Sequence, residues 1–380
     1  MRIGITCYPT YGGSGAVATE LGIALAAGGH EVHFISYRQP FRLPSFLPRV
    51  FFHEVDVGRY PLFEYPPYDL ALAVKMHEVV LDRKLEILHC HYAIPHATSA
   101  WIAREMLREG ESDVKVITTL HGTDITIVGQ ESSFYAITKF SIEKSDSVTA
   151  VSEYLRDETF RAFGCTGCTV QVIPNFIDPE RFRRANNVFP LPAETVAGRK
   201  VLMHISNFRP VKRIRDVVQT FARVQASIPA MLVMVGDGPD RGDAEAEARD
   251  LGVADHVLFL GKIDPVAPLL AGADLFLLPS DAESFGLSAL EALAAGVPVI
   301  GAKVGGLPTV VQHGVTGVLC NVGDVEGMAD AAIGLLNDPV RWQQFSDAAA
   351  ADAQLRFSQS NVVAQYEALY EHTLTLPRHA

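Results

Sequence analysis

Two glutamates, Glu283 and Glu291, stand eight residues apart where an apolar helix is predicted to begin. The Leu- and Ala-rich run after Gly286, stopped by Gly296 and Pro298, predicts that helix. A carboxylate inside it needs a partner to replace its lost hydration. Glu283 precedes the helix, where free N–H groups attract anions. The pattern indicates a site for a polyol or a nucleotide; the alternative is a capping carboxylate plus an ordinary surface glutamate.

Three cations within five residues, Arg209, Lys212 and Arg213, lie between a predicted strand and a predicted helix. Cations at the start of a helix oppose its dipole, so we expect an anion to accompany them. A diphosphate leaving group is such an anion, and these side chains can neutralise it without a metal. The alternative is a solvated helix start.

Further candidates follow the ends of predicted strands. His121 can donate to a sugar hydroxyl or phosphate, with Asp124 fixing its tautomer, although a purely structural role is an equal alternative. The turn Gly236–Pro239 can admit a nucleoside or simply reverse the chain. Lys262 and Ile263 follow the next strand, where backbone groups can bind the edge of a base.

A glycine-rich loop, Gly12–Gly15, separates the first predicted strand from a helix that Ser14 can cap. Together with Ala18, the loop also fits a dinucleotide-binding fingerprint. Nicotinamide binding, however, calls for an acidic residue near the end of the second strand. Tyr37 and Arg38 stand there instead, which suits at best a phosphorylated ribose, so nicotinamide binding is disfavoured.

Composition limits the classes of protein. The 380 residues suggest two domains, 48% hydrophobic residues fit a compact enzyme, and the net charge of −12 argues against nucleic acid or an anionic membrane as partner. The apolar runs are interrupted by charged residues, Gly or Pro, and no signal peptide precedes the first strand. The five scattered cysteines fit a reducing cytoplasm, and Cys165 and Cys168 alone favour a surface turn over a zinc site.

Strand-like and helix-like segments alternate and then start again, which predicts two parallel α/β sheets. We expect the first domain over residues 1–174, completed by a C-terminal helix at about 356–380, and the second over 175–355. Open α/β sheets bind ligands beyond the carboxyl ends of their strands, so a cleft between the domains is expected to hold the site. The predicted strands are Arg2–Cys7, Glu31–Ser36, Phe51–Val55, Glu86–His89, Val114–Leu120, Ser147–Val151, Val170–Ile173, Lys200–Ile205, Met231–Val235, His256–Leu260, Leu275–Leu278 and Val297–Ile300.

Gln39–Pro67 departs from this alternation, with six prolines and several aromatic residues. A lid, an acceptor-side wall, a subunit interface and a plain packed connection all remain open for it.

Taken together, these motifs resemble the large retaining glycosyltransferase family with two Rossmann-like domains, the GT-B architecture. The resemblance covers nearly the whole chain and rests on Glu283-x7-Glu291, the loop Gly12–Gly15, the turn at Lys212, the turn Gly236–Pro239 and a loop that begins at Gly305. It implies that a nucleotide sugar is the donor and that no metal or other cofactor is needed. It also implies that the C-terminal helix crosses back onto the first domain.

The resemblance assigns roles to individual residues. Glu283 would bind hydroxyls of the donor sugar and Glu291 the ribose, while Arg209, Lys212 and His121 would complete the catalytic group. Asn207 stands where many relatives have Arg, so Arg209 would take over that charge. Thr309 stands where many have Glu, so any role of that carboxylate is absent here. The donor-binding residues would be Gly12, Gly13, Ser14, Asn207, Gly236, Lys262, Ile263, Ser284, Phe285, Gly286, Leu287 and Glu291.

The opening strand and loop, the run His89–Ala97 and the run Ser206–Arg213 resemble one subgroup in particular. That subgroup joins N-acetylglucosamine from UDP-GlcNAc to L-malate in bacillithiol biosynthesis. A dicarboxylate acceptor needs cationic or hydroxyl partners on the first domain, for which the candidates are Lys75, Tyr92, Thr123 and Lys139.

Alternatives stay open at this point. They are a glycosyltransferase of the same family with another acceptor, a nucleotide-sugar epimerase, and a catalytically silent scaffold subunit. The expected setting is cytoplasmic, without integral membrane contact and with a homo-oligomer as an open option.

Overall fold

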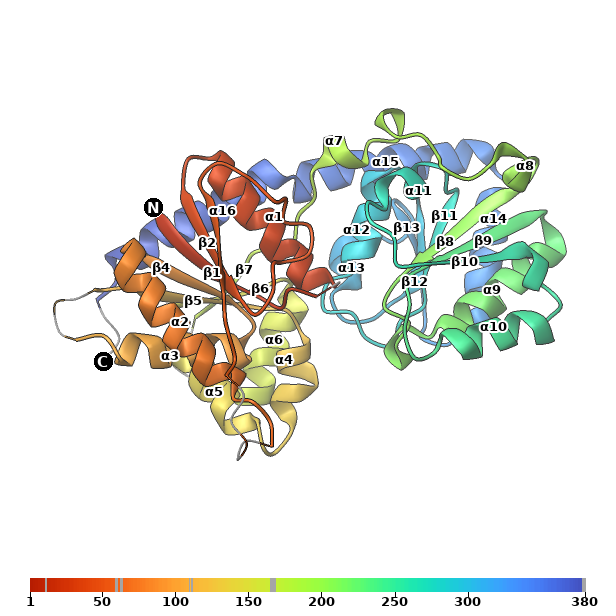
Figure 1. Ribbon diagram of the computed structural model, residues 1–380. Helices are drawn as coiled ribbons and strands as arrows, with labels where there is room; N and C mark the ends of the chain where they lie inside the picture. The colour runs from red at the N-terminus through yellow and green to blue at the C-terminus, as the bar shows by residue number, and fades with distance from the viewer. Residues whose placement is uncertain are drawn as a thin grey trace. The chain divides into compact units, whose positions relative to one another are not determined.

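The structure is a computed structural model that describes residues 1–10, 12–58, 61, 64–108, 110, 112–164 and 169–377. The candidate zinc pair Cys165 and Cys168 lies outside these residues, as do parts of Gln39–Pro67. The chain divides into two compact units: unit 1 is Met1–Asn175 with Ser360–Ala380, and unit 2 is Phe176–Gln359. Each unit is described below by itself (Figure 1).

Unit 1 is built on a seven-stranded parallel sheet in the order β3-β2-β1-β4-β5-β6-β7 (Figure 1). The strands are short and rich in Ile and Val, as expected for strands that are covered on both faces. Their bounds are β1 Arg2–Thr6, β2 Glu31–Ser36, β3 Val50–Glu54, β4 Ile87–His91, β5 Lys115–Leu120, β6 Ser147–Ala150 and β7 Val170–Val172.

Helices connect most of these strands, as the alternating pattern predicts, whereas β3 follows β2 without one. The longer ones bury an apolar face against the sheet; α2, for example, buries Leu72, Met76, Val79 and Val80. The helices are α1 Gly13–Ala27, α2 Tyr68–Arg83, α3 Thr98–Glu105, α4 Thr123–Thr126, α5 Tyr135–Glu143 and α6 Glu153–Phe163, with the short turns η1 Ala93–Ala97 and η2 Val128–Gln130.

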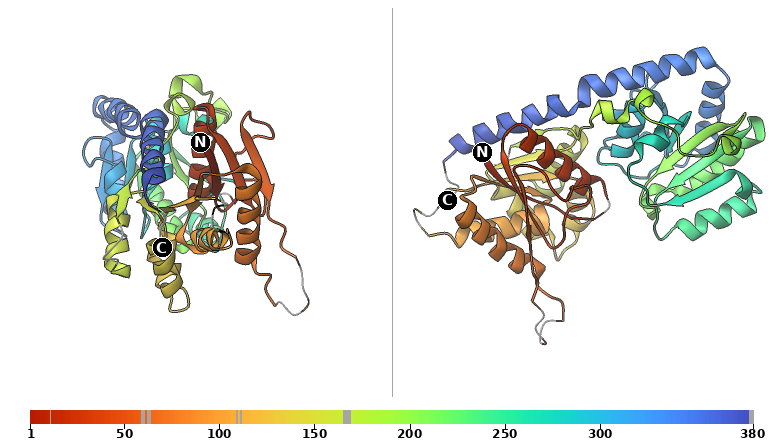
Figure 2. Two further views of the ribbon diagram at one scale, coloured as in Figure 1. Left: turned by 90° about the vertical axis from the view of Figure 1, so that its left-hand side faces the viewer. Right: turned by 45° about the horizontal axis from the view of Figure 1, so that its top comes forward.

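The C-terminal helix α16 (Gln359–Thr375) packs on unit 1, alongside its sheet (Figure 2). Tyr370 Oη lies 2.7 Å from Nδ1 of His89 on β4, and Thr373 Oγ1 lies 2.8 Å from Oγ of Ser147 on β6. Tyr366 and Tyr370 are almost fully buried. The helix is therefore an integral part of the unit 1 core.

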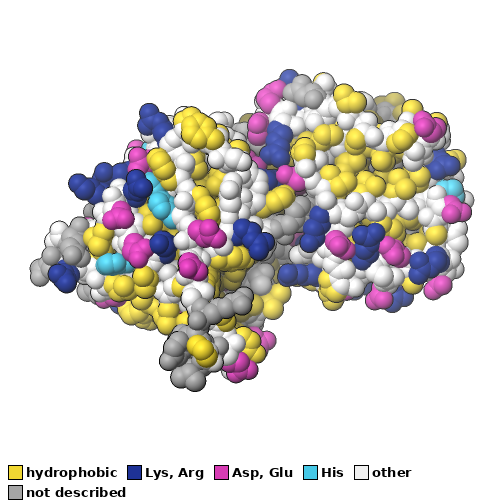
Figure 3. Space-filling view, in the orientation of Figure 1, with side chains coloured by type: hydrophobic (Ala, Val, Ile, Leu, Met, Phe, Trp, Pro, Cys, Tyr) yellow, Lys and Arg dark blue, Asp and Glu magenta, His cyan; other side chains and the backbone are white. Residues whose placement is uncertain are grey.

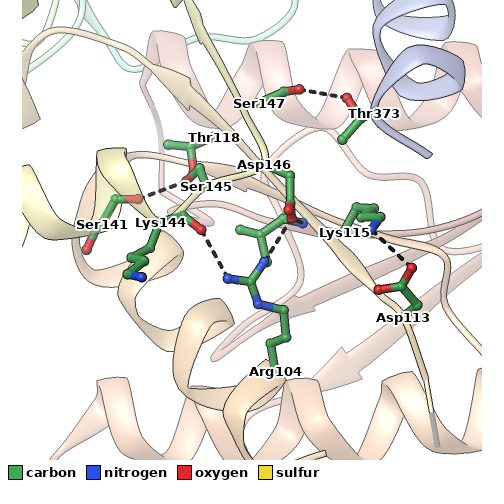
Figure 4. A network of polar contacts seen from close by, with 11 residues as sticks. Arg104, Asp113, Lys115, Thr118, Ser141, Lys144, Ser145, Asp146, Ser147 and Thr373 are labelled. Atoms are coloured by element: carbon green, nitrogen blue, oxygen red, sulfur yellow. Dashed lines mark hydrogen bonds and ion pairs between the residues drawn. The ribbon is translucent and has the colours of Figure 1, made fainter. Parts of the chain in front are cut away.

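A buried ion pair joins α3 to the amino ends of β5 and β6 (Figure 4). Nη1 of Arg104 donates to Asp146 Oδ2 at 2.9 Å, and Nη2 donates to the Lys144 carbonyl at 3.1 Å. The same Asp146 oxygen accepts the Val116 N–H at 2.7 Å. Since each charge is buried, removing one partner would leave the other uncompensated. The pair therefore fixes the amino ends of these two strands, and the candidate site lies at the opposite, carboxyl ends.

Unit 2 contains a six-stranded parallel sheet in the order β10-β9-β8-β11-β12-β13. The strands are β8 Lys200–Ile205, β9 Ala230–Val235, β10 Val257–Gly261, β11 Leu275–Leu278, β12 Val299–Ala302 and β13 Gly317–Cys320. The edge strand β13 is absent from the sequence prediction. It is short and begins with Gly317, where an added Cβ would lie 2.2 Å from the Val299 carbonyl oxygen, so tight backbone packing rather than side-chain pattern defines it.

The helices of unit 2 enclose a core in which Phe208, Phe221, Leu232, Met234 and Leu277 are almost completely buried. Charged side chains of both signs intersperse on the surface over α9 and α10 (Figure 3), with Arg215 and Glu247 paired at 2.6 Å. The helices are α7 Pro179–Phe182, α8 Ala193–Val196, α9 Ile214–Ser227, α10 Arg241–Asp250, α11 Ala267–Ala271, α12 Leu287–Ala294, α13 Leu307–Val310, α14 Val325–Leu336 and α15 Pro339–Phe357, with turns η3 Arg184–Asn186, η4 Pro210–Lys212 and η5 Ala254–His256.

Among the described residues, no helix combines the length and the apolar character needed to cross a bilayer.

Candidate functional site

The central contact of unit 2 joins Lys212 to Glu283. Nζ of Lys212 donates to Glu283 Oε1 at 2.6 Å, and Ser280 Oγ donates to the same oxygen at 2.8 Å. Glu283 is buried, with 9% of its side chain exposed, whereas 21% of the Lys212 side chain is exposed. A buried carboxylate is thus held by one ammonium and one hydroxyl, and the ammonium has two further hydrogens to offer an anion.

Close backbone packing positions the turn that carries Lys212. The turn follows β8 and enters α9 through η4, and Phe208 adopts a positive φ of 39° with its side chain buried in the core. An added Cβ on Gly236 would lie 1.8 Å from the Ser206 carbonyl oxygen, and one on Gly238 would lie 2.1 Å from that of Asn207. The Gly236–Pro239 turn therefore supports this turn directly, a contact that only glycine permits.

Asn207 and Arg209 occupy different surroundings on that turn. Oδ1 of Asn207 is buried and has no hydrogen-bond partner among the described residues, so this oxygen can accept a hydrogen bond from a ligand. Arg209 is exposed. Lys262 and Ile263 follow β10, as predicted, and Lys262 is also exposed.

The Glu283 loop is held by the glycines predicted at Gly305. The Gly306 N–H donates to the Glu283 carbonyl at 2.7 Å, and an added Cβ on Gly305 would lie 2.1 Å from the same oxygen. These two contacts place the backbone of Glu283 against the loop after β12. The carboxylate is therefore aimed by backbone packing on one side and by Ser280 and Lys212 on the other.

Helix α12 begins at Leu287, as the sequence predicts, after Gly286 in a left-handed conformation with φ of 97°. Its first N–H groups have no intrahelical acceptors and can bind phosphate or sugar oxygens. The Phe285 ring is buried and packs edge-on against Phe357 at 5.7 Å. Ser284 precedes it, and Glu291 is buried within the helix with 6% of its surface exposed. Glu291 is thus placed inside the apolar stretch rather than on the surface.

Unit 1 has a separate cluster of candidate residues at the carboxyl ends of β4 and β5. Nδ1 of His91 and Nε2 of His121 are 2.8 Å apart, and their rings stack with centroids 5.1 Å apart. Asp124 accepts the backbone N–H groups of Ala93, His121 and Gly122 at 3.0, 3.3 and 3.0 Å. The expectation that Asp124 fixes the tautomer of His121 is therefore wrong, because its oxygens bind backbone while His91 bonds the ring.

Burial shifts the pKa of several groups in this cluster. It lowers the pKa of His121 to about 3, although part of that residue's surface remains exposed, and lowers that of His91 well below its usual value. It raises the pKa of Asp124 to about 6, opposed by the backbone N–H groups that the carboxylate accepts. The imidazoles are therefore neutral at physiological pH.

Tyr92 and Ser14 meet beside this cluster. The Tyr92 hydroxyl donates to Ser14 Oγ at 3.1 Å and also interacts with Thr123, while burial raises the pKa of Tyr92 to about 12. Ser14 does not cap α1: Gly12 occupies the cap position without a side-chain hydrogen bond, and Gly13 opens the helix. The capping role expected of Ser14 is thus wrong, because its hydroxyl accepts from Tyr92 instead.

The two lysines assigned to the acceptor are each paired within their own helix. Lys75 Nζ lies 2.6 Å from Glu78 Oε2 on α2, and Lys139 Nζ lies 3.8 Å from Glu143 Oε1 on α5. No contact of either ammonium with Tyr92 or Thr123 is present among the described residues. The structure therefore brings Tyr92, Thr123 and Ser14 together and leaves the lysines with intrahelical partners.

Two residues in these contacts are absent from the sequence prediction of the site. Ser280 lies two residues after β11 and three residues before Glu283, and this position is its only signal in the sequence. His91 is marked by its alternation with His89, since residues two apart on a strand point to the same face. Each forms a hydrogen bond with a predicted site residue: Ser280 with Glu283, and His91 with His121.

Comparison with known proteins identifies the class. The family model described as Glycosyltransferase Family 4 matches residues 11–181, and that described as Glycosyl transferases group 1 matches residues 199–338. The two models correspond to the two Rossmann-like units. The chain belongs to the two-domain GT-B glycosyltransferases, and it is therefore a glycosyltransferase.

One relative is similar to this chain in sequence over nearly its full length. The chain is 50% identical over 376 residues to the N-acetyl-alpha-D-glucosaminyl L-malate synthase of Bacillus anthracis, covering 98% of this chain and 97% of the relative. Among solved structures, sucrose-phosphate synthase from Thermosynechococcus elongatus matches with a TM-score of 0.79 at 23% identity, covering 98% of each chain. The Anabaena protein HepE, solved with UDP and glucose, matches with a TM-score of 0.76 at 19% identity over 97% of this chain and 99% of its own. These two structures support the fold.

Proposed function

We propose that this protein transfers N-acetylglucosamine from UDP-GlcNAc to the hydroxyl of L-malate with retention of configuration, as the first step of bacillithiol biosynthesis. The observation that carries the proposal is the 50% identity, over nearly the full length of both chains, to a protein named for that product. The Lys212–Glu283 pair and the Tyr92–Ser14 contact are consistent with it because they supply groups for an anionic donor and a polar acceptor.

Donor binding is assigned mainly to unit 2. Glu283 would bind hydroxyls of the sugar, and the first N–H groups of α12 would bind the diphosphate. Lys212, with three ammonium hydrogens, can keep its bond to Glu283 while contacting a phosphate oxygen. Arg209, exposed on the same turn, adds positive charge. These groups would stabilise charge that develops as the diphosphate leaves, which requires no metal.

Acceptor binding is assigned to unit 1. No carboxylate is assigned as a covalent nucleophile, so the malate hydroxyl would attack from the side on which the diphosphate leaves, and a diphosphate oxygen would take its proton. Tyr92 and Thr123 offer hydroxyls to the malate carboxylates. Lys75 and Lys139 would have to exchange Glu78 and Glu143 for malate, so we rank them below Tyr92.

The decisive experiment mixes purified protein with UDP-GlcNAc and a panel of hydroxy acids and neutral alcohols, followed by mass spectrometry and NMR of the product. We expect N-acetylglucosaminyl malate with an α linkage. Preference for a neutral polyol such as inositol would reject the acceptor, and a changed nucleotide sugar released without an acceptor would indicate epimerisation instead. A cytoplasmic location and a homo-oligomeric state stay predictions.

A further inference from the structure

His91 and His121 share one hydrogen bond, and its direction decides what His121 can do for a substrate. The bond joins His91 Nδ1 to His121 Nε2 at 2.8 Å, so one ring donates and the other accepts. Burial disfavours a charged imidazole at His91, which has no exposed surface. Each ring therefore carries one hydrogen, and the hydrogen of His121 lies either on Nε2, facing His91, or on Nδ1, facing away.

The far nitrogen of His91 distinguishes these two arrangements. Nε2 of His91 is buried and has no hydrogen-bond partner among the described residues. If His121 donated, the hydrogen of His91 would lie on that Nε2 and would be a buried N–H without an acceptor, which is rare in native proteins. If His91 donates from Nδ1, its Nε2 instead carries a lone pair, and only an acceptor is left without a partner.

Neighbouring His96 has the arrangement in which Nδ1 carries the hydrogen and Nε2 is an acceptor without a described partner. Its Nδ1 bonds to the His91 carbonyl oxygen at 2.5 Å, and a carbonyl can only accept, so the hydrogen of His96 is on Nδ1. The Nε2 of His96 is then a bare lone pair, and it too is buried without a described partner. The cluster therefore accommodates an orphan imidazole acceptor.

A second histidine pair in the same sheet shows the opposite arrangement. Nδ1 of His33 on β2 lies 2.8 Å from Nε2 of His53 on β3, with ring centroids 5.1 Å apart. There, Nε2 of His33 lies 2.9 Å from Glu31 Oε1, which accepts its hydrogen. His33 must then accept from His53. The two pairs share their geometry and differ in whether the far nitrogen has an acceptor.

We propose that His91 is a positioning residue that donates from Nδ1 to His121 Nε2 and so holds His121 as the Nδ1–H tautomer, presenting a neutral N–H donor to a phosphate or sugar oxygen of the donor substrate. This role rests on the proposed function, since it assumes that His121 contacts the substrate. A free imidazole prefers its hydrogen on Nε2, so the protein must impose this form. His121 is then a hydrogen-bond donor and neither a general base nor a cation.

The tautomers can be measured without substrate. Long-range ¹H–¹⁵N spectra of protein labelled with ¹⁵N-histidine separate the two forms, and single substitutions assign the 13 histidines. We expect His91 and His121 as Nδ1–H and His33 as Nε2–H in the same spectrum. A folded wild-type protein in which His121 carries its hydrogen on Nε2 would overturn the proposal, whatever the reaction is.

Two variants of His91 test its effect on turnover. In His91→Phe the donor is lost, so we expect His121 to revert to Nε2–H and kcat to fall roughly five- to tenfold, the usual effect of one hydrogen bond, with little change in the KM for malate. In His91→Asn the side-chain amide can still donate, so the Nδ1–H form and most of kcat should return.

His33→Phe is the matched control, since it removes the equivalent histidine contact outside the site. It should lower the melting temperature without changing kcat or the His121 spectrum. Equal kinetic losses in His33→Phe and His91→Phe, or an unchanged His121 tautomer in His91→Phe, would reduce His91 to a packing residue. If the wild type lacked malate transfer while His121 was Nδ1–H, only the proposed function would fail.

Discussion

The ammonium of Lys212 and the carboxylate of Glu283 lie 2.6 Å apart although 71 positions separate them in the chain. The contact exists because β8 and β11, the strands that precede them, are neighbours in the sheet of unit 2. Both residues therefore emerge at the carboxyl edge of the same sheet, where parallel α/β folds bind ligands.

Loss of either partner of this pair should abolish most transfer. Loss of a hydrogen bond to a charged group costs about 1.5–3 kcal/mol, so Lys212→Ala and Glu283→Gln should each reduce kcat/KM at least roughly tenfold. The double variant should lose less than the sum of the two, because the residues are in contact.

The control for this pair is Lys200→Ala. Lys200 pairs with Asp274 at 3.3 Å in the same unit, and 42% of its side chain is exposed. The pair lies at the amino ends of β8 and β11, whereas Lys212 and Glu283 follow their carboxyl ends. The activity of Lys200→Ala should be near wild type. Near-normal turnover of folded Lys212→Ala or Glu283→Gln would reject the donor-site assignment.

Activity should survive chelation, because cationic side chains and N–H groups are assigned to the diphosphate. Initial rates of transfer measured with and without excess EDTA should agree within error. Abolition by EDTA and restoration by Mg²⁺ would show that the proposed role of Lys212 and Arg209 is insufficient.

Tyr92→Phe should raise the KM for malate more than that for UDP-GlcNAc, since it removes the hydroxyl placed beside Ser14 and Thr123. Tyr135→Phe is the control, because its hydroxyl donates to the Ala162 carbonyl elsewhere in unit 1. Lys75→Ala and Lys139→Ala, measured in parallel, show whether either lysine leaves its glutamate for malate. Equal effects of Tyr92→Phe on both substrates would contradict the acceptor assignment.

Gly305→Ala should impair both stability and donor binding. Gly305 has a φ of 54°, and its Cβ would meet the Glu283 carbonyl oxygen at 2.1 Å, so the loop that aims the carboxylate must move. Gly252→Ala shares a positive φ of 69° but has open space, so it should cost only about 1–2 kcal/mol of backbone strain and leave the KM for UDP-GlcNAc unchanged. A Gly305→Ala protein with normal KM would contradict the proposed positioning of Glu283.

Stability should fall as the pH drops below about 6.5. Burial lowers the folded-state pKa of His89 to about 3 and that of His96 to about 4, and it lowers that of His91 well below its usual value, whereas the unfolded chain titrates near 6.5. The unfolded state therefore binds more protons between these values, and each histidine removes about 1.4 kcal/mol per pH unit from the free energy of unfolding. The contribution is fully present above pH 6.5.

Asp124 acts in the opposite sense. Its pKa is raised to about 6, so its protonation favours the folded state as the pH falls from about 6 to 4. One carboxyl offsets only part of the effect of three imidazoles. Denaturant titrations at pH 7.5 and 5.5 should show the loss, and His89→Gln should reduce the slope by about one proton. A pH-independent free energy of unfolding over this range would show that the histidines titrate normally.

The sequence alone determines the alternation of strands and helices and the location of the chemistry within it. The bounds expected for Glu31–Ser36, Lys200–Ile205 and Leu275–Leu278 match β2, β8 and β11, because short segments rich in Val, Ile, Leu and Phe between turn residues are typical of buried strands. The start of α12 at Leu287 follows for a similar local reason, since Gly286 is in a left-handed conformation there. The family resemblance, carried by short motifs, is likewise confirmed by comparison.

Only the tertiary structure decides which of those motif residues touch. Ser14 bonds Tyr92 rather than capping its own helix, and the ring of His121 bonds His91 rather than Asp124. These partners lie 78 and 30 positions away, and strand order in the sheet brings them together. Local sequence specifies the backbone conformation of each turn. The pairing of side chains from different turns depends on which strands are neighbours, and the strand order is determined by packing of the whole sheet.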